Sequence, residues 1–279
     1  MSRHPQIELL FSEYIRSLPL MKREFNSPGL RFADTDMSVI GGVEDLRLLD
    51  PSAPALPIAA VDASSNMIGY SGGYAYELLR AGIVMKKGNG RMRLIKLGPF
   101  IIKSSSDGAS FLFELETLAQ RMAGRRIKNG IVLFDGTMIE STDSELTLGS
   151  FEGLSNSISL SKVVPVSRIG NSEELPKNPF IAKLKDEDCY LVRLSSNGFV
   201  LRARASTKDI ESTAWLFSCL SRSDSIEMGY PRTMKLAHMY SKILSMDIIS
   251  ARLALFEKHN IRARDPIDGR KLLLGCLWG

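Results

Sequence analysis

Two aspartates that each follow an apolar run are the residues of this sequence best suited to chemistry. Asp62 lies in the string VDASS after Pro57–Val61, and Asp135 lies in FDGTM after Gly130–Phe134. Both runs predict buried strands that end at the aspartate. Two carboxylates at the ends of central strands can point into one cleft, where hard oxygen ligands suit Mg²⁺ or Mn²⁺. Metal centres of this kind hydrolyse phosphodiesters. The alternative interpretation is that each aspartate simply belongs to a turn after its strand.

Two further segments offer metal ligands. The predicted helix FLFELETLAQRMAG carries Glu114 and Glu116 at the two borders of its apolar face. A glutamate at the margin of a core is costly unless it is paired or bound to a metal, although an exposed helical glutamate is the commoner case. His238 lies about two turns into a predicted helix that follows the turn Gly229-Tyr-Pro231. It is a candidate ligand, and a structural role in packing is its alternative.

The hydrophobic pattern predicts the elements that position these residues. Helices are expected over 4–24, 111–124, 209–220, 232–243 and 246–260, and strands over 57–62, 74–86, 92–102, 130–134, 158–166, 189–194 and 198–204. The segment 143–154 is expected to be a short helix or a loop. This order predicts an α/β fold, a mixed sheet with helices packed on it, in a single domain over 1–279. Within it we expect an N-terminal extension (1–56), a core (57–245) and a C-terminal helix and tail (246–279).

Composition limits the class of protein. The chain has 279 residues, of which 44% are hydrophobic and 24% charged, as is ordinary for a globular protein. No apolar run reaches the roughly 18 residues of a membrane span, and the first residues lack the apolar region of a signal peptide. The three cysteines are far apart and show no zinc spacing. These features predict a reduced, cytoplasmic protein with no membrane contact.

Basic residues gather in several separate segments, and the formal net charge is +5. Such clusters can line one groove for nucleic-acid phosphates. The alternative is a set of solvated turns and helix ends. The clusters comprise Lys86, Lys87, Arg91, Arg93 and Lys96; Arg121, Arg125, Arg126 and Lys128; Arg193, Arg202 and Arg204; and Arg262, Arg264, Arg270 and Lys271.

The order of these motifs resembles the NurA nuclease family. VDASS, the acidic helix, FDGT, the pair Ser161-Lys162 and the pattern GYP-x₆-H follow one another over residues 57–245. The resemblance implies an RNase H-like fold and a DNA nuclease that uses Mn²⁺ or Mg²⁺. It further implies a homodimer that acts as a 5′–3′ exonuclease and single-strand endonuclease. The expected partner is a HerA-type hexameric ATPase, in DNA end resection and double-strand break repair.

The resemblance also assigns roles to residues. It implies that the metal ligands are Asp62, Glu116 (with Glu114 as the near alternative), Asp135 and His238. Lys162 would neutralise charge on the scissile phosphate, and Tyr230 would stack on a base or serve packing alone. Ala63 departs from the family, which usually has glycine there, and the segment between Asp135 and Lys162 is short and serine-rich. The alternative function is a non-catalytic nucleic-acid-binding or scaffold protein with the same fold; a metal-dependent phosphatase unrelated to DNA is a further rival.

Overall fold

A computed structural model describes residues 42–104, 109–135, 156–164, 175–185, 189–196, 198–207 and 209–264. The chain divides into two units, 1–39 and 40–279, and all described residues lie in the second unit. The helix predicted over 4–24 and the segment 143–154 lie outside the described residues.

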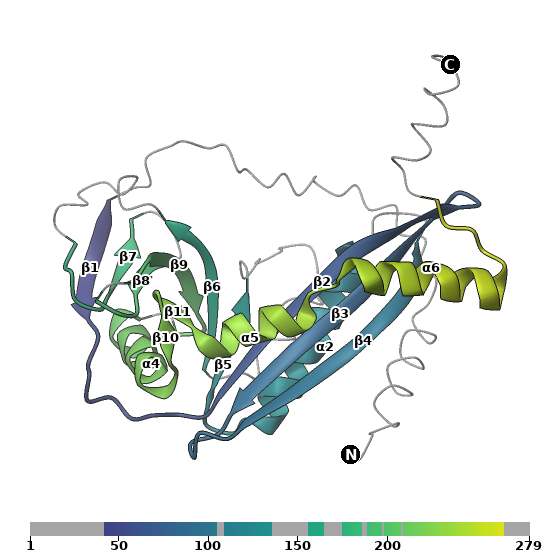
Figure 1. The fold of residues 1–279 in the computed structure, drawn as a ribbon. Helices are drawn as coiled ribbons and strands as arrows, with labels where there is room; N and C mark the ends of the chain where they lie inside the picture. The colour runs from purple at the N-terminus through teal and green to yellow at the C-terminus, as the bar shows by residue number, and fades with distance from the viewer. Residues whose placement is uncertain are drawn as a thin grey trace. The chain divides into compact units, whose positions relative to one another are not determined.

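A nine-stranded mixed sheet organises the described part of the chain (Figure 1). Its strands are β1 (Val43–Leu48), β2 (Ile58–Ser71), β3 (Tyr74–Lys86), β4 (Met92–Ser104), β5 (Ile131–Asp135), β6 (Ser157–Val164), β7 (Phe180–Leu184), β8 (Tyr190–Arg193) and β9 (Val200–Ala205). They lie in the order β1-β7-β8-β9-β6-β5-β2-β3-β4. The central strands β2, β5 and β6 run parallel, and the strands on both sides pair antiparallel. The predicted mixed α/β sheet is therefore confirmed.

Helices cover both faces of this sheet. They are α2 (Ala109–Arg126), α4 (Ile210–Ser223), α5 (Arg232–Ser241) and α6 (Ser245–His259), and a small hairpin of β10 (Ile226–Glu227) and β11 (Tyr230–Pro231) joins α4 to α5. Figure 1 shows α5 and α6 in front of the sheet and α2 behind it. Among the described residues, no helix combines the length and apolar composition needed to cross a membrane.

The main core lies between the sheet and the helices α4 and α5. Its members include Ile58 and Ala60 of β2, Ile131 and Leu133 of β5, and Phe217 of α4, all of them fully buried. Because alternate residues of a strand face the same side, the next positions in these two series are Asp62 and Asp135. The core thus fixes the register that turns both aspartates toward the face covered by α5.

Strand β3 has the predicted bounds, but β2 does not. The prediction that the first strand ends at Asp62 is wrong, because β2 continues to Ser71 and pairs with β3 along its length. Gly72 and Gly73 close this long hairpin, both with positive φ, which glycine adopts without steric cost. Asp62 is therefore a residue within a long strand rather than a terminal one.

Candidate metal centre

Asp62 and Asp135 are neighbours across two parallel strands. The pairing of β2 with β5 brings Val61 opposite Phe134, and the two aspartates are the next residues of their strands. The parallel pairing ends at this point. The Asp62 side chain is 10% exposed and the Asp135 side chain 35% exposed. The predicted convergence of these two carboxylates is therefore what the structure shows.

Helix α5 brings His238 to the same place. Its Nδ1 lies 3.2 Å from Oδ2 of Asp62 and 3.8 Å from Oδ2 of Asp135. One ligand atom from each of the three residues lies within 4.8 Å of the others. Two carboxylates and an imidazole form a donor set that suits a divalent cation such as Mn²⁺. The residues present therefore fit the metal that the sequence predicts.

Glu116 does not belong to this group of three but lies near enough to respond to it. Burial, followed by the charges of Asp62 and Asp135, raises its pKa to about 7. Burial alone raises the pKa of Glu114. Of the two glutamates left open by the sequence, Glu116 is thus the one close to the aspartates. Glu116 belongs to α2, which lies on the other face of the sheet from α5 (Figure 1).

Two hydroxyl groups, one from β11 and one from α5, form hydrogen bonds with the two aspartates. Tyr230 donates from its hydroxyl to Oδ1 of Asp135 at 3.4 Å, and burial together with that carboxylate raises the pKa of the tyrosine. Ser241, which is fully buried, donates from Oγ to Oδ2 of Asp62. The sequence drew attention to Tyr230 through the GYP string but to no property of Ser241. A serine at the end of a helix carries no pattern that sets it apart.

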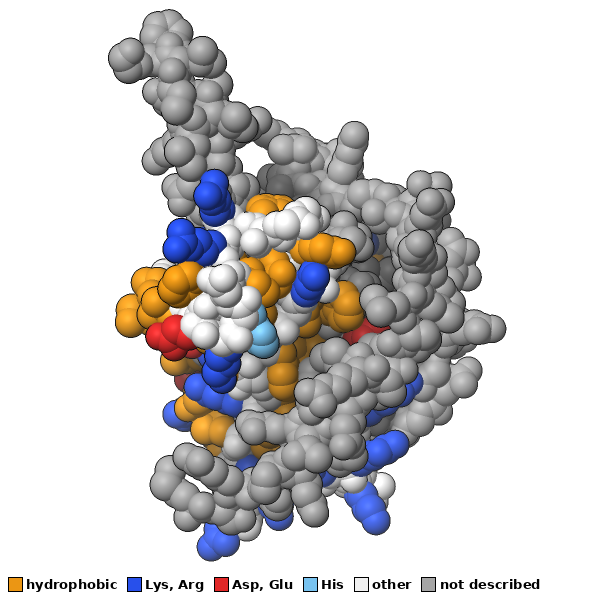
Figure 2. Space-filling view, turned by 90° about the vertical axis from the view of Figure 1, so that its right-hand side faces the viewer, with side chains coloured by type: hydrophobic (Ala, Val, Ile, Leu, Met, Phe, Trp, Pro, Cys, Tyr) orange, Lys and Arg blue, Asp and Glu red, His pale blue; other side chains and the backbone are white. Residues whose placement is uncertain are grey.

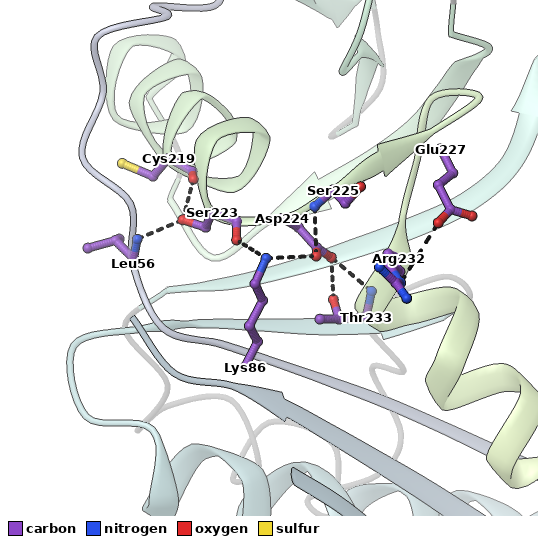
Figure 3. A network of polar contacts seen from close by, with 9 residues as sticks. All are labelled: Leu56, Lys86, Cys219, Ser223, Asp224, Ser225, Glu227, Arg232 and Thr233. Carbon is purple, nitrogen blue, oxygen red and sulfur yellow. Dashed lines mark hydrogen bonds and ion pairs between the residues drawn. The ribbon is translucent and has the colours of Figure 1, made fainter. Parts of the chain in front are cut away.

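A buried aspartate fixes the start of α5, the helix that carries His238 (Figure 3). Oδ2 of Asp224 accepts hydrogen bonds from the backbone N–H of Thr233 at 2.9 Å and from its Oγ1 at 2.6 Å. This contact caps the helix, whose own N-cap residue, Pro231, makes no side-chain cap. Nζ of Lys86 lies 3.6 Å from Oδ1 of Asp224 and donates to the Ser223 carbonyl oxygen at 2.8 Å. The start of α5 is thereby tied to β3 and to the end of α4.

Other members of the predicted basic clusters also serve the fold. Arg193 donates to the Pro176 carbonyl oxygen at 2.6 Å and lies over the Phe180 ring. Arg202 donates to Sγ of Cys189 at 3.3 Å. On the face shown in Figure 2, lysine and arginine side chains of the described residues lie at several places among hydrophobic and polar ones. The continuous basic groove stays a prediction.

Ala63, which stands where the NurA family usually has glycine, lies within β2 and is not among the residues with positive φ; the backbone there makes no demand for glycine. Lys162 belongs to β6, but its side chain lies outside the described residues, as do Arg270 and Lys271. The predicted role of Lys162 is therefore untested.

Solved structures resemble this fold. The NurA nuclease from Sulfolobus solfataricus matches with a TM-score of 0.53 and 15% identity, over 77% of this chain and 88% of that one. Endonuclease V from Streptomyces avermitilis matches with a TM-score of 0.41 and 15% identity, over 70% of this chain and 84% of that one. The catalytic domain of human endonuclease V matches with a TM-score of 0.42 and 14% identity, over 91% and 100%.

The sequence matches no protein-family model and no curated protein sequence. At 15% identity, the likeness to the NurA nuclease concerns the fold only. Together with the mixed nine-stranded sheet, it confirms the predicted RNase H-like fold.

Proposed function

We propose that this protein is a divalent-metal-dependent DNA nuclease. The observation that carries the proposal is the convergence of Asp62, Asp135 and His238, with one ligand atom of each within 4.8 Å of the others. They come from a central strand pair and from a helix packed on it, so the packing of the sheet and helix positions all three side chains. The fold shared with a NurA nuclease supports the same class of activity.

The residues of the site have distinct tasks in this proposal. Asp62, Asp135 and His238 hold the cation, with Glu116 as a further carboxylate on the other side. When bound, the cation supplies Lewis acidity and stabilises negative charge on a phosphodiester. Glu116, with its pKa raised to about 7, can hold or release a proton near neutral pH. Tyr230 keeps the Asp135 carboxylate in place through its hydroxyl.

The finer parts of the proposal follow the resemblance to the NurA family. We place the nuclease core in residues 57–245, which contain every site residue discussed above. The protein would act as a 5′–3′ exonuclease and single-strand endonuclease beside a HerA-type ATPase, in end resection and double-strand break repair. The preferred ion would be Mn²⁺, with Mg²⁺ as the substitute. A cytoplasmic location fits the buried thiols of Cys189 and Cys219, which are not joined in a disulfide.

An apolar stripe on α6 supports the proposed homodimer. Met246, Ile249, Leu253 and Phe256 are 67%, 48%, 55% and 42% exposed. Their spacing of three, four and three residues is the pattern that packs one helix against another. The opposite side of α6 already packs on the sheet through Ala251 and Leu255. Light scattering on the wild type and on Leu253→Glu tests this part: the variant should be monomeric at concentrations where the wild type is dimeric.

The main test is digestion of end-labelled linear DNA in Mn²⁺. The wild type should degrade the DNA, and Asp135→Asn should lower the rate by at least about a thousandfold, because a carboxylate ligand is lost. Asp45→Asn is the matched control. Asp45 is exposed on β1 with φ 48°, a conformation that asparagine tolerates, so this variant should cut as the wild type does.

The same experiment separates the alternative function. A wild-type protein that retains DNA in a filter or gel assay but cuts it with neither Mn²⁺ nor Mg²⁺ would be a non-catalytic nucleic-acid-binding or scaffold protein. Cleavage that is equally fast in Asp135→Asn and in the wild type would remove the metal centre from the mechanism.

A further inference from the structure

Ser241, the last residue of α5, makes a buried contact with the candidate metal centre. Its Oγ lies within hydrogen-bond distance of two acceptors, Oδ2 of Asp62 and the carbonyl oxygen of His238 at 2.9 Å, and its side chain is fully excluded from solvent. The same Asp62 oxygen lies 3.2 Å from Nδ1 of His238. One carboxylate oxygen of Asp62 thus has two neighbours from one helix, and both belong to the last turn of that helix.

A glycine allows α5 to approach Asp62 so closely. Gly82 of β3 is the cross-strand partner of Asp62. A Cβ atom at this position would lie 2.6 Å from the carbonyl oxygen of Ala237 and 2.9 Å from the backbone nitrogen of Ser241. Any larger residue would therefore separate the helix from the sheet at the level of the site.

Other contacts fix the end of the helix in this place. Oγ of Ser64 donates to the carbonyl oxygen of Ser241. Arg80 donates to the carbonyl oxygen of Lys242 at 2.9 Å and forms a two-pronged ion pair with Asp247 at the start of α6. The Ser241 hydroxyl is therefore held on a rigid support rather than on a free helix end.

We propose that Ser241 is a positioning residue of the metal centre, an inference that rests on the proposed function. Its hydroxyl fixes the orientation of the Asp62 carboxylate beside Asp135 and His238, so that the ligand set is formed before a cation binds. Outer partners of this kind typically raise metal affinity by about 10–100-fold. A carboxylate that is already held in one rotamer loses less conformational entropy when the cation binds, so binding is tighter.

The test is the affinity of the full-length protein for Mn²⁺ alone, measured by calorimetry or by the electron paramagnetic resonance signal of free Mn²⁺. Ser241→Ala should weaken binding by about 10–100-fold. Ser64→Ala is the matched control, because it removes a hydrogen bond at the same junction of helix and sheet without touching Asp62. Its affinity should equal that of the wild type. Circular dichroism and urea unfolding check that each variant is folded.

Three outcomes would overturn the inference. Equal affinity in Ser241→Ala and the wild type would show that the hydroxyl does not act on Asp62. Equal losses in Ser241→Ala and Ser64→Ala would show a general loosening of the helix end. If Ser241→Ala does not fold, Ser241→Cys takes its place, since a thiol is a weaker donor of similar shape, and unchanged affinity there has the same meaning. A wild-type protein that binds no Mn²⁺ would instead refute the proposed function itself.

Discussion

At the residue scale, the candidate centre brings the carboxylates of Asp62 and Asp135 close to the buried Glu116. Asp62 and Asp135 both act to raise the pKa of Glu116, which is the sign of mutual repulsion. We expect Asp135→Asn to stabilise the metal-free protein by on the order of 1 kcal/mol, because one of the repelling charges is removed. Asparagine keeps an oxygen that can accept from Tyr230. Urea unfolding in EDTA measures the change, with Asp45→Asn as the control.

A loss of stability in Asp135→Asn would contradict this expectation and would favour a structural role for the aspartate. Addition of Mn²⁺ should reverse the order of stability. A cation that binds the folded wild type would stabilise it by mass action, while the variant would lack one ligand.

The raised pKa of Glu116 predicts that the stability of the protein falls as the pH rises. Its pKa rises from 4.5 to about 7 on folding, so the folded protein binds the proton more tightly than the unfolded chain. The contribution of Glu116 to the free energy of unfolding is therefore fully favourable below about pH 4.5. It is lost as the pH rises toward 7. The loss amounts to about 3 kcal/mol at most for a shift of this size. Mn²⁺ affinity should increase over the same interval, because the cation competes with the proton.

The measurement is urea unfolding of the metal-free protein between pH 4.5 and 8. Glu116→Gln should remove most of this pH dependence, since glutamine does not titrate. Glu114→Gln should leave most of it, because burial alone raises the pKa of Glu114 and neither aspartate contributes. Identical profiles for Glu116→Gln and the wild type would show that Glu116 does not sense the site.

The residues found from the sequence and those missed differ in how local their signals are. Asp62 and Asp135 follow apolar runs, and a strand with an acid after it is visible within a few positions. His238 was marked by the nearby GYP string. Ser241 acts only because Gly82 allows the helix to approach, and that contact joins positions 159 residues apart in the printed sequence. No local pattern encodes it.

At the scale of elements, α5 depends on a residue outside the helix. Asp224 has a fully buried side chain that caps α5 through Thr233 and pairs with Lys86. Asp224→Ala should cost about 3–5 kcal/mol, because it removes the acceptor of the Thr233 N–H and hydroxyl and the carboxylate that faces Lys86. Urea unfolding measures this cost. Since α5 carries His238, Mn²⁺ affinity should fall as well.

Glu227→Ala is the control for Asp224. Glu227 also pairs with cations, Lys235 at 2.8 Å and Arg232 at 3.8 Å (Figure 3 shows the latter), but these groups are largely exposed. Exposed ion pairs contribute about 0–1 kcal/mol, so this variant should stay close to the wild type. Similar losses in the two variants would refute the special role of the buried cap.

The predictability of each element follows from its composition. Strand β3 has eleven consecutive buried residues, Ala75–Met85, and its bounds were predicted correctly. The end of β2 was not, because residues 63–66 are small or polar and their strand conformation comes from pairing with β3. The strands β1 and β7 were not predicted. VEDLRL has mixed charges, and FIAKL is short; the two form a pair at the edge of the sheet.

At the scale of the whole molecule, the order of the strands explains why distant motifs meet. The parallel strands β2, β5 and β6 form the centre, and antiparallel strands extend the sheet on both sides. Ligands in sheets with parallel strands bind beyond the carboxyl ends of those strands, and Asp135 is the last residue of β5. The mixed-sheet class was predictable from the order of the elements, whereas the pairing of β6 with β9 rather than with a later parallel strand was not.

Affinity for DNA depends on how basic side chains are distributed over the surface. Lys86 is occupied by Asp224 and the end of α4, so the cluster at the β3–β4 hairpin offers its exposed members instead, among them Arg91 and Arg93. Affinity for DNA should fall steeply with salt, because phosphate contacts release counterions. The double variant Arg91→Gln/Arg93→Gln should reduce the slope of log affinity against log salt by about one to two.

The control for this prediction is Lys177→Gln/Lys185→Gln, which removes two exposed lysines on either side of β7. Six strands lie between β7 and β4 in the sheet. The loss of net charge is the same in both double variants, so a general electrostatic effect would lower both slopes equally. A change confined to the arginine pair would place the β3–β4 hairpin on the path of the DNA. Unchanged slopes in the arginine variant would instead identify this cluster as a solvated hairpin tip, and would leave α2, with its exposed Arg121, Arg125 and Arg126, as the next surface to neutralise.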